Sequence, residues 1–240
     1  MDILYEDNHI LIVNKAPGEI VQGDKTGDTP LCETLKNFIK VRDNKPGNVF
    51  MGVVHRLDRP VGGVVIFAKT SKALSRLNEM LRKGEIHKTY RAITRKRPAE
   101  DEALLTHYIT TVERNNKSYT SDTPREGAKL SQLRYRLIAS SERYHLLEVQ
   151  LLTGRKHQIR VQLSAIGCPI KGDLKYGDRR SNPDGSISLL AYSIDFIHPV
   201  SKKHIHVTAP VPDDNLWRAL ASHAASDNNV SGTSVSDNDL

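Results

Sequence analysis

Strand-like segments follow one another through the middle of the chain, and no other feature limits the possible fold as strongly. Residues 87–94, 104–112, 133–138 and 146–152 are rich in β-branched and aromatic side chains, and several alternate apolar with polar positions. Strands that come in consecutive runs favour an α+β domain over a regular alternation of strands and helices. We therefore expect a mixed, largely antiparallel central sheet with flanking helices.

The rest of the chain supplies further strands and the helices that would cover the sheet. Thr70 or Ser71 is a suitable N-cap for an apolar stripe at helical spacing that ends at Gly84. Other helices are expected over residues 31–39, 157–166 and 212–223, and other strands within residues 1–15, 64–67, 189–197 and 204–209. We expect one domain over residues 1–225, followed by a disordered polar tail over the Ser-, Asp- and Asn-rich residues 226–240.

The charge balance favours a polyanionic partner. Lys and Arg number 35 against 28 acidic residues, which gives a formal net charge of +7. The tail holds three aspartates and no base, so residues 1–225 carry +10. Two cysteines provide neither a disulfide framework nor a set of four metal ligands. Without an apolar run of ~18 residues or a secretory signal, we expect a cytoplasmic monomer that does not contact membranes.

One carboxylate stands out because of the rigid loop on which it lies. Asp58 is flanked by Arg56 and Arg59 and is followed by Pro60, Val61 and the pair Gly62 and Gly63, just before an apolar strand. Proline restricts its own φ and the conformation of the residue before it, while the glycines permit a tight turn or close approach by another strand. Such an acid is suited to chemistry on an anionic substrate. The simpler alternative is that Asp58 only pairs with Arg56 or Arg59 and caps a turn.

A second segment provides the cation that this carboxylate would need. Residues 153–163 place basic and amide side chains in an otherwise apolar stretch, with Ile159 and Leu163 at helical spacing on a core face. Arg160 lies beside that face, where a guanidinium requires a partner. We expect the partner to be Asp58.

The two segments, with two others, resemble the RluA family of pseudouridine synthases. The family pattern His-Arg-Leu-Asp is present at residues 55–58, and the strand after it ends in Ala68-Lys69. Residues 4–18 resemble the first family motif, Lys88-Thr89-Tyr90-Arg91-Ala92 the tyrosine block, and residues 153–160 with 166–177 the last motif. The resemblance covers nearly the whole chain before the tail and implies a pseudouridine-synthase-like catalytic domain of the short form, without an N-terminal S4 domain.

The resemblance implies an isomerase that converts uridine to pseudouridine in a structured tRNA or rRNA, with no metal and no organic cofactor. The base would be flipped out of its helix, at a cost of a few kcal/mol. Asp58 would be the catalytic carboxylate, Arg160 would keep it ionised, and Tyr90 would offer its ring to the uracil and its phenol to a late proton transfer. Whether Asp58 attacks C1′, attacks C6 or removes a sugar proton stays open.

Six further residues are expected to contact RNA. Arg56 would enter the space that the flipped base leaves, with His55 close by, although His55 could equally be a structural histidine. Lys15, in the first motif, is either a phosphate contact or a solvated loop lysine. The other three lie in the last motif: Arg155, His157 and Gln158.

Several positions depart from the family pattern. Val61 and Gly62 replace hydroxyl residues, Lys156 replaces Thr, and Gln162 and Cys168 each replace His. These departures leave the acid, the tyrosine and the arginine in place but keep a second hypothesis open, a catalytically silent RNA chaperone. A glycosidase is a weaker third hypothesis, because it usually needs a second acid, for which Glu148 and Asp173 are the available residues.

Overall fold

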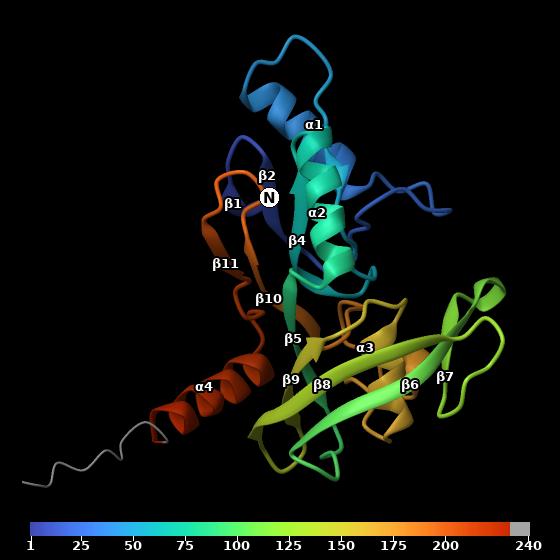
Figure 1. The fold of residues 1–240 in the computed structure, drawn as a ribbon. Coiled ribbons are helices and arrows are strands. Elements are labelled where there is room, and N and C mark those ends of the chain that lie inside the picture. The colour runs from blue at the N-terminus through green and yellow to red at the C-terminus, as the bar shows by residue number, and fades with distance from the viewer. Residues whose placement is uncertain (231–240) are drawn as a thin grey trace, which may run out of the picture.

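The computed structural model describes the backbone of residues 1–230 and the side chains of residues 1–224. Within these residues, eleven strands form a single sheet that four α-helices cover (Figure 1). The strands are β1 (Asp2–Glu6), β2 (Ile10–Lys15), β3 (Gly52–Val53), β4 (Gly62–Ala68), β5 (His87–Thr94), β6 (Glu102–Val112), β7 (Lys117–Ser121), β8 (Lys129–Ser140), β9 (His145–Leu151), β10 (Leu189–Ile197) and β11 (His204–Thr208). The helices are α1 (Leu31–Arg42), α2 (Ser71–Lys83), α3 (Gln158–Ala165) and α4 (Asn215–Val230), with short 3-10 turns η1 (Glu113–Asn115) and η2 (Leu174–Tyr176).

The sheet is mixed and largely antiparallel, as the sequence predicts. Its strand order is β1-β2-β4-β10-β5-β9-β8-β6-β7, with β11 beside β10 and β3 beside β4. Among the described strands, only β4 and β10 pair in parallel. This confirms the α+β class.

The parallel junction depends on Gly63. Its φ is +114°, and a Cβ at this position would lie 2.2 Å from the carbonyl oxygen of Ala191 on β10, so no other residue fits without moving the backbone. Ala191 is in turn paired with Tyr90 on β5. The junction therefore places the end of the Asp58 loop and Tyr90 two strands apart, in one row across the sheet.

Alternation along the central strands divides the core into two layers. On β2, Leu11 and Val13 face the layer that contains α1 and α3, while Ile10 and Ile12 face the layer of α2 and α4. β4 alternates in the same way and is buried along its whole length. Tyr90 belongs to the layer of α3, so the sheet fixes the face on which it meets the last motif.

Local signals set the ends of α2. The Thr70 side chain accepts a hydrogen bond from the backbone N–H of Ala73, and Gly84 ends the helix in the left-handed conformation. Both ends agree with the prediction. α3 has the core face that its spacing predicted, but its burial extends further. Residues 158–163 are all buried, and β6 and β7 pack against the helix.

Other differences lie at element ends. α1 continues to Arg42, three residues beyond the expected end, and the short strands β3 and β7 were not predicted. α4 runs from Asn215 to Val230, so its backbone enters the first five residues of the expected tail. Residues 231–240 of that tail lie outside the described residues. No described helix has both the length and the apolar character needed to cross a membrane.

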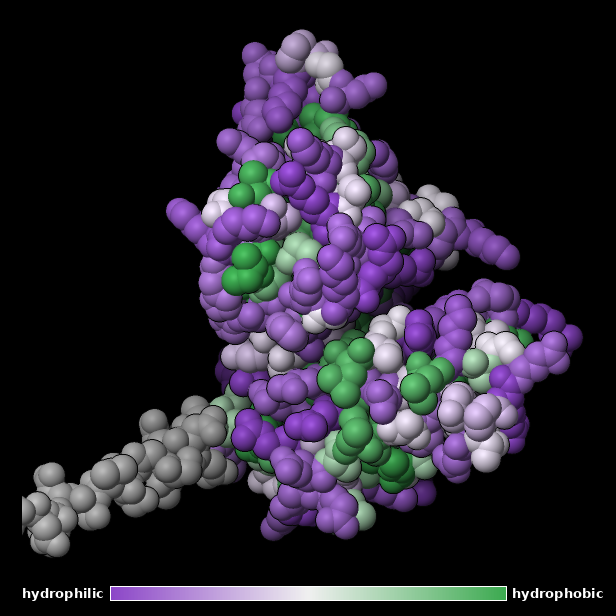
Figure 2. Space-filling model, viewed as in Figure 1, coloured by the Kyte–Doolittle hydropathy of each residue, from purple (hydrophilic) through white to green (hydrophobic). Residues whose placement is uncertain are grey.

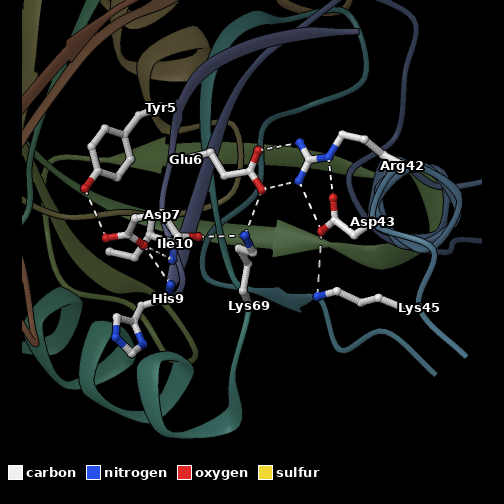
Figure 3. Close-up of polar contacts among 9 residues, drawn as sticks. All are labelled: Tyr5, Glu6, Asp7, His9, Ile10, Arg42, Asp43, Lys45 and Lys69. Carbon is white, nitrogen blue, oxygen red and sulfur yellow. Dashed lines mark hydrogen bonds and ion pairs between the residues drawn. The ribbon is translucent and has the colours of Figure 1, made fainter. Parts of the chain in front are cut away.

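A cluster of ion pairs joins α1 to the β1–β2 turn and to the end of β4 (Figure 3). The Glu6 carboxylate accepts two hydrogen bonds from Arg42, at 2.6 and 2.7 Å, and one from Lys69 at 2.7 Å. Lys69 also donates to the backbone oxygen of Asp7. The hydrogen bonds from Arg42, with help from Lys69, lower the pKa of Glu6 to about 2. Glu6 thus connects three segments that are distant in sequence.

We predict that Glu6→Gln lowers the free energy of unfolding at neutral pH by about 1–3 kcal/mol, because the largely buried Lys69 and the partly exposed Arg42 would both lose their charged acceptor. Since the pKa of Glu6 is lowered on folding, its contribution is present above the ordinary value near 4.5 and is lost as pH falls toward about 2. Urea titrations at pH 7 and pH 3 should therefore show a smaller acid-induced loss in the variant.

Glu33→Gln is the matched control for this experiment. Glu33 pairs with Lys36 one turn away on the surface of α1, and its own side chain is 48% exposed, against 19% for Glu6. Its loss should change stability by less than ~0.5 kcal/mol. Equal losses in the two variants would contradict a special role for Glu6.

Candidate active site

The loop that presents Asp58 is fixed by backbone groups on both sides. The N–H of Val61 donates to the Asp58 carbonyl, which closes the turn, and the N–H of Ile187 donates to the Pro60 carbonyl. The carbonyl of Arg59 accepts from the N–H of Gly18 at 2.8 Å and from Lys15 Nζ at 3.3 Å. The carboxylate is therefore held on a rigid turn.

Asp58 meets Arg160 across 102 residues of sequence, as predicted. Nη1 of Arg160 donates to Oδ2 of Asp58 at 2.9 Å. The flanking arginines are not its partners: Arg59 pairs with Asp28, and Arg56 is exposed at the rim of the pocket. The geometry thus excludes the simpler alternative in which Asp58 only pairs with a neighbour in its own loop.

A second carboxylate holds the other side of the same guanidinium. Nε and Nη2 of Arg160 donate to the two oxygens of Asp173, at 2.7 and 2.9 Å, and both side chains are almost fully buried. The ring of Tyr176 lies 5.0 Å from the guanidinium carbon. Burial alone would lower the pKa of Arg160, but the hydrogen bonds and charges of Asp173 and Asp58 raise it above its ordinary value. Arg160 therefore stays charged, and its Nη1–H, which Asp173 does not use, points at Asp58.

Tyr90 lies close to this pair and is buried in β5. Burial, together with the charge of Asp58, raises the pKa of its phenol above the ordinary value. The phenol is consequently protonated at neutral pH, so it can donate a hydrogen bond but is a poor base.

His157 approaches Asp58 from the start of α3. Its Nε2 lies 3.7 Å from Asp58 Oδ2, and its Nδ1 lies 2.8 Å from the hydroxyl of Tyr176. Burial lowers the pKa of His157 to about 4, against the opposing effect of the Asp58 charge. The imidazole is therefore neutral at physiological pH.

Asp58, Arg160 and His157 line a pocket of about 260 Å³ between the loop after β2 and the β6–β7 hairpin, whereas Tyr90, Asp173 and Tyr176 lie behind its lining. Figure 2 shows the notch between the upper and lower parts of the molecule at its right edge, with mostly hydrophilic walls. Among the described residues that line the pocket, five are lysines or arginines and two are aspartates, so the pocket attracts anions. Its volume suits one nucleoside rather than an extended ligand.

Two of the predicted RNA contacts have structural roles instead. The Lys15 side chain is buried, and its ammonium group donates to the carbonyls of Ala16, Glu19 and Arg59, which satisfies all three of its hydrogens. Burial lowers its pKa to about 8. Gln158 is also buried: its oxygen accepts from Thr153 and from the N–H of Arg155, and its amide donates to the Gln132 carbonyl. Neither side chain reaches the surface that RNA would approach.

The other predicted RNA contacts fall into two groups, one buried side chain and several at the surface or the pocket. Nε2 of His55 accepts a hydrogen bond from the N–H of Ile66 at 3.2 Å, and burial lowers its pKa to about 3, so it is a neutral support for β4. Arg56 and Arg155 are exposed, and Arg56 lines the pocket together with His157. The geometry therefore places Arg56 and His157 on the pocket and His55 outside its lining.

Sequence reasoning missed Asp173 and Tyr176 as members of this site. Both lie in the last motif, where Asp173 had been considered only as a possible second acid of a glycosidase. A signal was present, because a buried arginine requires acceptors for several N–H groups and Asp58 can satisfy only part of them. In the described part of the chain, no group of three or more His, Cys, Asp and Glu side chains is arranged to hold a metal ion.

Comparison with known proteins agrees with this geometry. The family model for RNA pseudouridylate synthases matches residues 9–165, which is more than half of the chain. The chain belongs to the RluA family of RNA pseudouridine synthases. It is 32% identical to the ribosomal large subunit pseudouridine synthase D of Xanthomonas campestris, over 94% of this chain and 71% of that protein. It is 34% identical to the uncharacterized RNA pseudouridine synthase YhcT of Bacillus subtilis, over 92% of this chain and 73% of that protein.

A solved structure shares the fold. Human RNA pseudouridylate synthase domain containing 4 superposes with a TM-score of 0.75 at 22% identity, over 93% of each chain. Membership of the RNA pseudouridine synthase family makes the enzyme an isomerase. Its Gly62 departs from the hydroxyl residue common in the family for a local reason: a Cβ there would lie 3.1 Å from the Lys15 carbonyl oxygen and from a ring carbon of Pro17. The departure belongs to the packing of the loop after β2 and does not touch the carboxylate.

Proposed function

We propose that this enzyme isomerises a specific uridine in large-subunit ribosomal RNA, with Asp58 as the catalytic carboxylate. The observation that carries the proposal is the pairing of Asp58 with Arg160, which two hydrogen bonds to Asp173 hold in place, at a cationic pocket of nucleoside size. The choice of ribosomal RNA rests on relatives named as ribosomal large subunit synthases, among them those of Xanthomonas campestris and Vibrio cholerae.

The position of the Asp58 carboxylate inside the pocket supports base flipping. A uridine stacked in a helix cannot reach an oxygen that lies inside a pocket, so the nucleotide must leave the stack first. Arg56 is exposed at the rim, where a planar guanidinium can contact the bases or phosphates beside the vacated position. The pocket then surrounds the detached uracil and keeps it from diffusing away before it rejoins the ribose through C5.

The roles of the other groups follow from their protonation. Arg160 keeps Asp58 oriented and balances its charge. Tyr90 is buried near Asp58 and lies outside the pocket lining, and its protonated phenol would serve in positioning and hydrogen-bond donation to the detached uracil. Removal of the C5 proton by Tyr90 would require a phenolate beside the Asp58 carboxylate, which burial and that charge oppose.

The test is pseudouridine formation on defined RNAs. Unmodified transcripts of large-subunit rRNA and of tRNAs from the source organism would be incubated with purified enzyme, and pseudouridines mapped by carbodiimide-dependent stops in primer extension. We expect a new stop at a discrete uridine of the rRNA. Stops only in tRNA would overturn the rRNA assignment, and no stop in any transcript or in ribosomal particles would overturn the proposal.

A further inference from the structure

The hydroxyl of Tyr176 determines which nitrogen of His157 carries the hydrogen. The backbone N–H of Ser118 donates to this hydroxyl at 2.8 Å, so the oxygen already accepts one hydrogen bond. The phenol has one hydrogen of its own, and His157 Nδ1, at 2.8 Å, is positioned to accept it. The Ser118 side chain also interacts with this hydroxyl, and Ser118 Oγ uses its own hydrogen on the Lys156 carbonyl. The 2.8 Å contact to Nδ1 is the short one, and leaving the buried phenol hydrogen without an acceptor would be costly. This contact favours Nδ1 as the acceptor, which places the hydrogen of the neutral ring on Nε2.

Nε2 faces the pocket beside the catalytic carboxylate without being bound to it. The distance from Nε2 to Asp58 Oδ2 is 3.7 Å, beyond a hydrogen bond, and that oxygen already accepts from Arg160. Both sides of this gap are fixed: the Asp58 turn by its backbone contacts, and the imidazole by Tyr176, whose ring it meets edge-on. The donor on Nε2 is thus directed at the space that a flipped nucleoside would fill.

The backbone at this position is consistent with a functional requirement. His157 has a φ of +56°, in the left-handed region, where a residue with a Cβ is disfavoured and glycine is the least strained choice. A histidine here starts α3 without capping it, since no hydrogen bond from its side chain to the helix is found. Strained residues of this kind are concentrated at functional sites.

We propose that His157 is a further catalytic residue of this enzyme, a neutral imidazole whose Nε2–H donates a hydrogen bond to an oxygen of the target nucleoside next to Asp58. Tyr176 is the positioning residue that fixes this tautomer. The oxygen is either the ribose 2′-hydroxyl or a uracil carbonyl, which share the acceptor chemistry. The charged groups around the imidazole are Asp58, Arg160, Lys175 and Lys156. This inference rests on the proposed function.

The tautomer can be measured without substrate. Nitrogen-15 NMR of the imidazole should show a hydrogen on Nε2 and none on Nδ1 at neutral pH in the wild-type protein. Tyr176→Phe removes the donor to Nδ1 and should produce a mixture of tautomers. A hydrogen on Nδ1 of the wild-type ring would overturn the proposal.

Activity provides the second test, with a variant that restores the donor. His157→Leu should lower kcat/KM by ~10- to 100-fold, the range for loss of one donor in a site. His157→Gln places an amide N–H near the position of Nε2 and should recover most of this loss, with both variants folded by circular dichroism. If the two variants are equally impaired, or if His157→Leu is fully active, the proposal is wrong.

Modified RNA identifies the acceptor. With a 2′-deoxyuridine at the target position, His157→Leu should cause no further loss if the ribose hydroxyl is the acceptor, and its usual loss if a uracil carbonyl is. A wild-type enzyme that forms no pseudouridine in any RNA would defeat the proposed function, and this inference with it. An active wild type with an unaffected His157→Leu variant would defeat only the inference.

Discussion

Asp58→Asn is expected to abolish pseudouridine formation, with a fall in single-turnover rate of ~10³-fold or more, while RNA affinity changes only a few-fold. Asparagine has the same shape and can still accept the hydrogen bond from Arg160, so the loop should keep its conformation. Asp173 continues to balance the buried guanidinium, so the fold is not left with an unpaired internal charge. What is lost is the ionised oxygen that faces the nucleoside.

Asp24→Asn is the matched control for this experiment, because Asp24 is the other carboxylate among the described residues that line the pocket. It is exposed and is hydrogen-bonded to Thr26 in the loop after β2. Its removal should leave the single-turnover rate within a few-fold of wild type. The rates would be measured with excess enzyme over RNA, and affinity by filter binding. If the protein were a catalytically silent RNA chaperone, wild type would form no pseudouridine, and wild type, Asp58→Asn and Asp24→Asn would bind RNA equally. That result would contradict the proposed enzymatic function.

The parts of this structure that could be predicted are those determined by local sequence or by chemical necessity. The ends of α2 follow from Thr70 and Gly84, which satisfy helix-terminal groups within a few residues. The contact between Asp58 and Arg160 could be predicted for two reasons. A cation at the edge of the core requires a carboxylate partner, and the two residues lie in motifs of the same family. β7 could not be found, because four of its five residues are polar and the segment forms a strand only through pairing with β6.

The direction of polar side chains was the main source of error. Lys15 and Gln158 have the composition of RNA contacts, yet both point inward and satisfy backbone groups of loops that are distant in sequence. Nothing in their own segments distinguishes a lysine that meets phosphate from one that meets three carbonyls. Asp173 is the opposite case: it has the composition of a surface acid and is buried because Arg160, thirteen residues earlier, requires it.

Asp173→Asn is expected to cost about 3–5 kcal/mol in the free energy of unfolding and to lower the turnover of the protein that remains folded. The carboxylate accepts two parallel hydrogen bonds from Arg160 inside the core. An asparagine offers one acceptor and turns an amide N–H toward the guanidinium, so one donor faces another. Arg160 would then share its charge with Asp58 alone and could rotate, which would move the N–H that orients Asp58.

Asp178→Asn separates this effect from a general loosening of the segment. Asp178 is also buried and lies in the same segment, but it binds Arg95 and the N–H of Gly172 and does not contact Arg160. The Asp178→Asn variant should have a lower melting temperature than wild type. Its single-turnover rate, measured well below that temperature, should stay close to wild type. Because Asp173 contacts the Arg160 guanidinium and Asp178 binds Arg95 instead, only Asp173→Asn of the two variants should lose both stability and rate. Matching rates in the two variants would show that Arg160 is oriented by Asp58 and the stacking of Tyr176 without its second carboxylate.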